Sequence, residues 1–105
     1  MGRVKEIIWT LAVVEDLEQI HFFYADKSIS AATRIIENII DKAESLKFTE
    51  QYQKDDLNPN YHRLFVRHFK LVYKIGGNNI LILRAFDCRS NPDTMILDDD
   101  ELILL

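Results

Sequence analysis

Hydrophobic residues recur at a helical spacing in two consecutive stretches of the amino-terminal half. The first stretch follows Thr10, a residue type that caps helices. The second is longer, over residues 32–46, and carries charged residues on its opposite side. We therefore predict one helix from Thr10 to about residue 26 and another over residues 31–47, capped by Ser30. The two apolar stripes are Val13, Leu17, Ile20 and Tyr24, then Ala32, Ile35, Ile36, Ile39, Ile40, Ala43 and Leu46.

The remaining hydrophobic runs alternate with the two-residue period of β-strands. A short strand is predicted over residues 4–9, and three more over residues 61–67, 69–75 and 79–86. Residues 48–60 are polar and predict a loop, while the sequence Gly76-Gly77-Asn78-Asn79 suits a tight hairpin. This order predicts an α+β fold: an N-terminal strand, a helical hairpin, then a three-stranded antiparallel meander, with the helices packed on one face of the sheet.

The length of the chain suits one domain. Its 105 residues, 48% of them hydrophobic, are enough for a single core but not for two. We assign residues 1–95 to this domain and residues 96–105 to an acidic and apolar C-terminal tail. Charged residues interrupt the apolar amino terminus, so no membrane segment is expected, and the single Cys88 cannot form an internal disulfide. These features favour a cytoplasmic protein.

Positive charge is concentrated in residues 62–89. This segment carries six basic residues and one acidic residue, whereas residues 1–60 carry seven basic and eleven acidic ones. Residues 90–105 carry five acidic residues and no basic one. A chain of net charge −4 does not coat nucleic acid non-specifically, but a local basic surface still suits an anionic target or an acidic partner.

Strand alternation predicts which side chains share the basic face. If Leu64/Val66, Leu71/Tyr73 and Leu81/Leu83 receive the helices, the opposite face collects cations with aromatic residues between them. Such a face suits phosphates and stacked bases, or an acidic partner segment. It also suits a plain solvated sheet face, which carries Lys and Arg for solubility. With the cation after the last strand, the candidate binding residues are Arg63, Phe65, Arg67, Lys70, Lys74, Arg84, Phe86 and Arg89.

An ordered set of short patterns resembles the RelE/ParE superfamily of bacterial toxin–antitoxin toxins over residues 3–95. The first helix carries one pattern, the predicted strands over residues 61–67 and 69–75 carry two, and the end of the last strand carries another. They are Ala12, Asp16-Leu17, Ile20 and Tyr24; Tyr61-His62-Arg63-Leu64 with Val66-Arg67; Phe69-Lys70-Leu71-Val72-Tyr73-Lys74-Ile75; and Phe86-Asp87-Cys88-Arg89-Ser90-Asn91-Pro92.

The resemblance implies a small cytoplasmic toxin that a cognate antitoxin neutralises, and that meets operator DNA only through this antitoxin. Family members are either ribosome-dependent messenger-RNA endonucleases or poisons of DNA gyrase. The nuclease pattern falls on Arg63, Phe65, Lys70, Arg89 and the neighbourhood of Met95. Phe65 and Met95 can neither carry charge nor donate a proton, so the ParE branch and gyrase are favoured. An inactive relative that only binds antitoxin and helps to repress its operon is the third alternative.

Two further features complete the sequence predictions. His68 is a candidate acid or base for a nuclease, although a hydrogen-bonded turn histidine is the simpler interpretation. The three histidines have no partners at ligand spacing, so neither a metal nor another cofactor is expected. The acidic tail, which includes Asp98-Asp99-Asp100-Glu101 between two apolar runs, is predicted to lie across the basic sheet and shield it.

Overall fold

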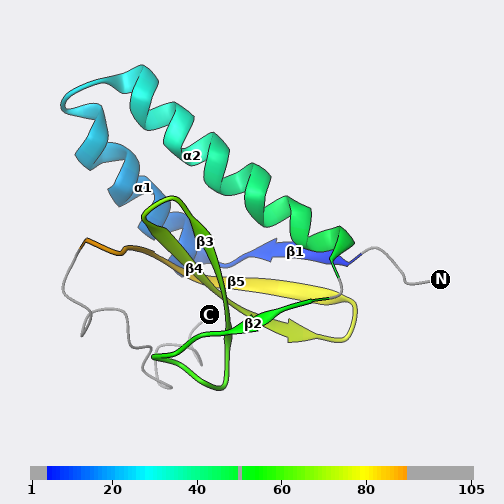
Figure 1. Ribbon diagram of the computed structural model, residues 1–105. Coiled ribbons are helices and arrows are strands. Elements are labelled where there is room, and N and C mark those ends of the chain that lie inside the picture. The colour runs from blue at the N-terminus through cyan, green and yellow to red at the C-terminus, as the bar shows by residue number, and fades with distance from the viewer. Residues whose placement is uncertain (1–4, 50, 90–105) are drawn as a thin grey trace.

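The computed structural model describes residues 5–49 and 51–89. The elements follow one another as predicted, with a helical hairpin after the first strand and a meander after that (Figure 1). The α+β prediction is confirmed. The elements are β1 (Glu6–Trp9), α1 (Leu11–Ala25), α2 (Ile29–Glu44), a short 3₁₀ helix η1 (Ser45–Phe48), β2 (Gln53–Lys54), β3 (His62–Val66), β4 (Phe69–Gly76) and β5 (Asn79–Asp87).

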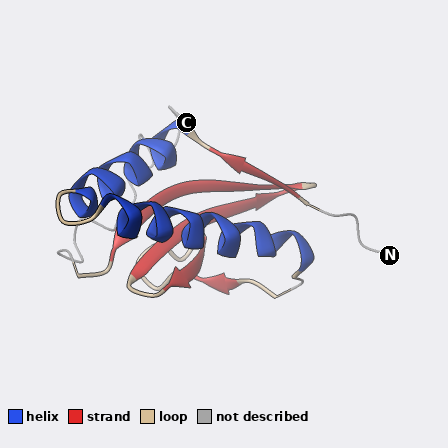
Figure 2. Ribbon diagram, turned by 90° about the horizontal axis from the view of Figure 1, so that it is seen from above, coloured by secondary structure: helices blue, strands red, loops and turns tan. Residues whose placement is uncertain are grey.

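Five strands form one mixed sheet in the order β1-β5-β4-β3-β2. β1 runs parallel to β5, and the other neighbours are antiparallel. Both helices lie over one face, as the view from above shows (Figure 2). The face away from α1 and α2 is called the open face below. β2 lies in the segment predicted to be a loop, and Val4, which the first predicted strand included, lies outside the described residues.

Hydroxyl side chains start both helices. Thr10 Oγ1 accepts a hydrogen bond from the Val13 amide at 3.4 Å and donates to the Ile82 carbonyl at 2.7 Å, so it caps α1 and ties its start to β5. The prediction of Ser30 as the cap of α2 was wrong, because Ser28 has the extended backbone of a cap and accepts from the Ala31 amide at 3.2 Å. The helix therefore begins two residues earlier than predicted.

One change of register decides which residues of β5 face the helices. Tyr73 pairs with Ile82 but Val72 pairs with Arg84, so Leu83 is an extra residue that forms a β-bulge. Before the bulge, Ile80 pairs with Ile75, which belongs to the core under the helices.

Because of the bulge, the faces predicted for the first half of β5 were wrong. Ile80 and Ile82 lie in the core under the helices, whereas Leu81 and Leu83 lie on the open face, the reverse of the prediction. After the bulge the alternation changes phase, so Phe86 packs with Val72 on the open face as predicted. Within the part of the chain that the structure describes, no helix is long and apolar enough to cross a membrane.

Candidate functional site

The open face gathers most of the residues predicted to bind a partner. Phe86 packs there, with Lys70 Nζ 5.9 Å and Arg84 Cζ 5.3 Å from its ring centroid. On β3, Arg63 Cζ lies 5.1 Å from the centroid of the exposed Phe65 ring. Each such contact contributes about 0.5–1 kcal/mol at exposed sites. Cations and aromatic rings therefore alternate across this face, as the strand pattern predicted.

Lys70 is nevertheless buried, with 4% of its surface exposed. Its Nζ lies 2.8 Å from Oδ1 of Asp55, which is 2% exposed, and Asn58 Nδ2 donates to the other carboxylate oxygen at 2.7 Å. Burial alone would raise the pKa of Asp55, but the hydrogen bonds from Lys70 and Asn58 and the charge of Lys70 together lower it. This pair anchors the segment before β3 to β4. Lys70 therefore holds the residues around the site in place and does not contact a partner itself.

The cations exposed to solvent are elsewhere in the predicted set. Arg67 and Lys74 are exposed, and neither has a carboxylate within ion-pair distance among the described residues. Arg67 is the first residue of the tight turn between β3 and β4 and has a positive φ of 55°. A non-glycine residue rarely adopts this conformation. Arg67 lines a surface pocket together with Asn38 and Lys42 of α2.

A polar cluster joins the end of β5 to the end of α1. The Tyr24 hydroxyl donates to Asp87 Oδ2 at 2.8 Å and lies 3.1 Å from His68 Nε2. Arg89 Nη2 is 3.2 Å from Asp87 Oδ2, and the Arg89 guanidinium lies 5.6 Å from the centroid of the Tyr24 ring. His68 thus lies in the turn before β4 and is hydrogen-bonded there, and Arg89 faces the same carboxylate.

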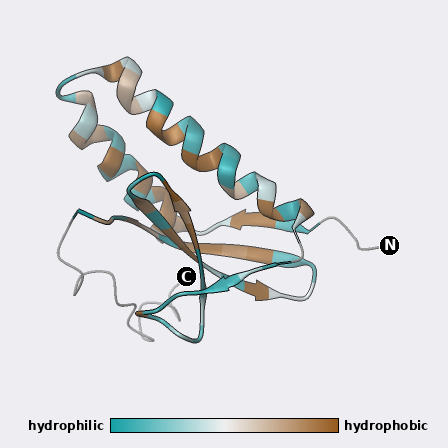
Figure 3. Ribbon diagram, in the orientation of Figure 1, coloured by the Kyte–Doolittle hydropathy of each residue, from teal (hydrophilic) through white to brown (hydrophobic). Residues whose placement is uncertain are grey.

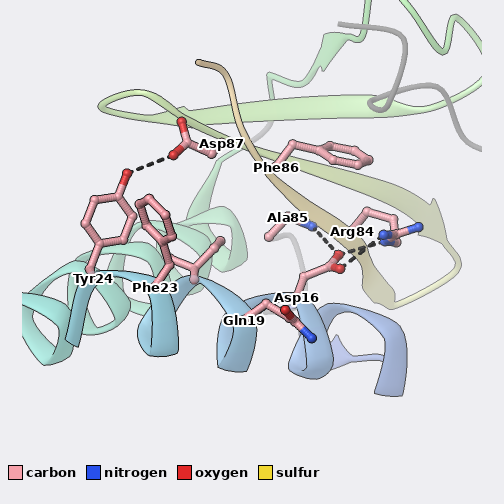
Figure 4. Close-up of a pocket in the computed structure, with 9 residues that line it drawn as sticks. Asp16, Gln19, Phe23, Tyr24, Arg84, Ala85, Phe86 and Asp87 are labelled. Atoms are coloured by element: carbon pink, nitrogen blue, oxygen red, sulfur yellow. Dashed lines mark hydrogen bonds and ion pairs between the residues drawn. The ribbon is translucent and has the colours of Figure 1, made fainter. Parts of the chain in front are cut away.

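A groove of about 350 Å³ lies between α1 and the second half of β5 (Figure 4). It forms because β1 ends opposite Ile82, which leaves the following part of β5 without a strand on that side. Asp16 of α1 closes one end, accepting from Arg84 Nε at 2.7 Å and from the Ala85 amide at 2.9 Å. The helix side of the groove consists of Asp16, Gln19, Ile20, Phe23 and Tyr24, and the strand side of Arg84, Ala85, Phe86 and Asp87.

Sequence reasoning missed the helix side of this groove. Asp16 and Tyr24 belonged to the first-helix pattern, but nothing placed them near the basic strands. Phe23, which is 68% exposed at the groove, had one available signal: with Phe22 it lies outside the apolar stripe that packs on the core. A large aromatic residue outside the buried stripe of an amphipathic helix indicates a contact surface.

The described residues contain no group of three or more His, Cys, Asp or Glu side chains that could hold a metal ion. His21 lies 3.3 Å from the Thr33 hydroxyl, and His62 stacks on Tyr73 with 5.6 Å between ring centroids. Burial raises the pKa of the Cys88 thiol, which favours its unreactive neutral form.

Comparison with known proteins places these features in a family. The model of a family described as the ParE toxin of the type II toxin–antitoxin system parDE matches residues 7–92. Among solved structures, one described as the chromosomal ParDE TA system from P. aeruginosa is similar, with a TM-score of 0.74 and 19% identity. The match covers 82% of this chain and 98% of that chain, and at this identity it shows the fold alone. No curated protein sequence matches.

Proposed function

Because this chain belongs to the ParE toxin family of type II toxin–antitoxin systems, we propose that it arrests bacterial growth by binding DNA gyrase and not by cutting RNA. One observation carries this choice: three of the cations that a nuclease would use already have carboxylate partners. The pairs are Arg63 with Asp56 at 2.8 Å, Lys70 with Asp55 at 2.8 Å and Arg89 with Asp87 at 3.2 Å.

These ion pairs oppose phosphate cleavage for a simple electrostatic reason. A scissile phosphate needs preorganised positive charge aimed at the oxygens that become more negative in the transition state. Here each of those three cations faces a carboxylate, so a phosphate would have to displace it first. His68, the acid or base candidate, is held by Tyr24. Binding a protein requires no such set of unmatched charges.

The residues that support binding are exposed and of the types that dominate interfaces. Arg67 and Lys74 offer cations, while Phe65 and Phe23 offer large aromatic surfaces. Aromatic and Arg side chains are enriched among the residues that carry most of the energy of protein interfaces. We propose that Arg67, Lys74 and Phe65 contact the target, with Arg63, Arg84, Phe86 and Arg89 framing the surface around them.

A cognate antitoxin would neutralise the toxin by covering its exposed hydrophobic residues. Phe22, Phe23 and Ile29 lie close together in sequence at the tip of the helical hairpin and are all exposed. An exposed apolar cluster of this kind marks a protein interaction site on a soluble domain. The open face and the hairpin tip are therefore the proposed antitoxin surfaces, and an open reading frame adjacent to the gene is the place to find the partner.

The function is tested by inducing the chain alone in a bacterial host and by adding the purified chain to gyrase. We expect filamentation with a DNA-damage response in cells, and loss of supercoiling with accumulated cleaved DNA in the gyrase assay. Arg67→Ala combined with Lys74→Ala should abolish both effects. Arg34→Ala, which removes an exposed cation from α2, is the matched control and should leave them unchanged.

Two results would overturn the proposal. Early cutting of messenger RNA at codons, mapped by primer extension, would make the chain a ribosome-dependent endonuclease. Normal growth together with tight antitoxin binding would make it an inactive relative that only binds its antitoxin.

A further inference from the structure

The turn between β3 and β4 is strained at its first residue. Val66 pairs with Phe69, so the turn consists of Arg67 and His68 alone. Arg67 has a φ of 55°, and His68 is not among the described residues with a positive φ. A positive φ at the first position only is the pattern of a type II′ turn, in which glycine is the usual residue. The chain therefore carries a large charged side chain where a glycine would relieve the strain.

Arg67 lies beside the second helix. It lines a cavity of about 450 Å³ between the turn and α2, which we call the α2 notch. The ribbon coloured by hydropathy shows the turn in the hydrophilic colour and α2 banded between hydrophilic and hydrophobic (Figure 3). The helix side of the notch consists of Asn38, Asp41, Lys42 and Ser45, and the strand side of Val66 and Arg67.

Two cations of the α2 notch lack a carboxylate partner. Neither Lys42 nor Arg67 has a carboxylate within ion-pair distance among the described residues, although Asp41 lines the same notch. Apart from Lys74, the other cations of the predicted set do have one. The last carbonyls of α2, which would repel an anion, already accept hydrogen bonds from the hydroxyl and amide of Ser45. With two positive charges and one negative, the notch is suited to one further negative charge.

We propose that the α2 notch binds the carboxylate of an Asp or Glu side chain on a protein partner, and that the strained turn places Arg67 beside Lys42 and Asn38 for this purpose. The guanidinium of Arg67 presents a planar fork of N–H donors that matches the two oxygens of a carboxylate. Lys42 adds a second charge, and the side-chain amide of Asn38 adds a neutral donor. Backbone strain at a residue with a binding role is a common feature of ligand sites.

A protein carboxylate suits the notch better than the phosphates of a nucleic acid. A single carboxylate supplies the one negative charge that the notch lacks. A nucleic acid brings a row of negative charges to a chain whose net charge is −4. The exposed Glu37 and Asp41 of α2 would repel the phosphates on either side of a bound one.

The inference rests on the proposed function in one respect, because Arg67 belongs to the surface assigned there to target binding. It adds Asn38 and Lys42, which lie outside the predicted set, and it names the group on the partner that they recognise. The acidic tail over residues 96–105, which the sequence predicts to shield the basic sheet, lies outside the described residues. The experiments below use the full-length chain, so this tail is present in all of them.

A small probe tests the carboxylate site directly. Amide signals of the ¹⁵N-labelled full-length chain are recorded while N-acetylglutamic acid methylamide is added at constant ionic strength. We expect the signals of Asn38, Lys42 and Arg67 to shift and to saturate. The glutamine analogue, which has the same shape without the charge, should leave them unchanged. Arg67→Gly should abolish the shifts, whereas Arg34→Ala, which removes an exposed cation of α2 outside the notch, should retain them.

Urea unfolding separates the role of the side chain from its effect on the fold. Arg67→Ala keeps a Cβ at the positive φ, whereas Arg67→Gly removes the strain. The equilibrium constant for unfolding should therefore be about fivefold lower in Arg67→Gly than in Arg67→Ala, after allowing for the greater freedom of glycine in the unfolded chain. A loss of binding in the more stable Arg67→Gly variant then comes from the missing guanidinium.

The gyrase assay links the notch to activity. Arg67→Gly and Lys42→Ala should each raise the half-inhibiting concentration about fivefold, and Arg34→Ala should leave it unchanged. No saturable shift with the glutamate probe would overturn the inference, and so would stronger shifts with dimethyl phosphate, which would make the notch a phosphodiester site. Equal stability of Arg67→Gly and Arg67→Ala would refute the strain. If the natural chain does not inhibit gyrase, the proposed function fails, while the probe titration still decides the notch.

Discussion

Replacing Lys70 with methionine should destabilise the protein strongly, because it leaves the buried carboxylate of Asp55 without its cation. The two charged atoms are 2.8 Å apart and both side chains are almost fully buried. At an effective dielectric constant of about 20, a separation of this size gives an attraction of about 6 kcal/mol. The cost of removing two ions from water is several kcal/mol each, so the intact pair contributes little net stability, whereas one buried charge left alone costs about 3–5 kcal/mol.

A double variant isolates the charge from the loss of packing. Asp55→Asn keeps the shape of the side chain and an oxygen that can accept from Asn58, but it removes the negative charge. Lys70→Met combined with Asp55→Asn should therefore recover more than half of the free energy of unfolding that Lys70→Met loses. Urea unfolding of the four proteins, with unchanged slopes, gives the coupling energy. A loss of less than about 1 kcal/mol in Lys70→Met alone would refute the reasoning.

The pH dependence of the same variant has a defined sign. In the natural chain the pKa of Asp55 is below its ordinary value of 3.8, so the stability that Asp55 contributes is present above that pH and lost as the pH falls through the lowered pKa. In Lys70→Met the burial of Asp55 remains but the cation is gone, so its pKa should rise above the ordinary value. The difference in stability between the two proteins should shrink from neutral pH towards about pH 4. A constant difference would show that Asp55 is not the group left uncompensated.

Three other substitutions have outcomes set by single features of the structure. Gly77→Ala, at a φ of 57°, should cost about 1 kcal/mol in urea unfolding, while Gly76→Ala, with open space around it, should change little; equal effects would contradict this. Asp16→Ala should cost about 2–3 kcal/mol, because the Arg84 side chain and one strand amide lose their acceptor, and Asp16→Asn should cost less. Burial raises the pKa of Tyr73 to about 12, so the stability it contributes is present below pH 10.0 and lost as the pH rises through about 12. Tyr73→Phe should therefore resist alkaline unfolding, followed by circular dichroism, better than the natural chain, and identical curves would contradict the assignment.

The sequence predicts the order and type of the main elements because each has a strong local signal. The apolar stripe of the second helix and the glycines of the hairpin are local signals that span only a few residues. The helix and the hairpin that they predict are both present in the structure. Thr10 was identified as a cap, but its hydrogen bond to the Ile82 carbonyl joins residues 72 positions apart and has no local signature. The same holds for β2, whose two residues form a strand only because β3 lies beside them.

The bulge at Leu83 shows how a small irregularity changes the predicted surface. Alternation has a period of two, so one extra residue exchanges the faces of every residue on one side of it. It moved Leu81 and Leu83 to the open face and thereby created the hydrophobic cluster there. No residue in β5 marks this position, since neither glycine nor proline occurs between Asn79 and Asp87.

The net charge of a sequence segment overstates the positive field of the surface it forms. Residues 62–89 carry an excess of five positive charges in the sequence, but the fold brings acidic residues from other segments beside them. Asp16 comes from α1, and Asp55 and Asp56 from the segment before β3. Of the predicted set, the two exposed cations without an ion pair among the described residues are Lys74 on β4 and Arg67 in the turn beside α2. They lie apart, which favours an extended partner surface over a single bound phosphate.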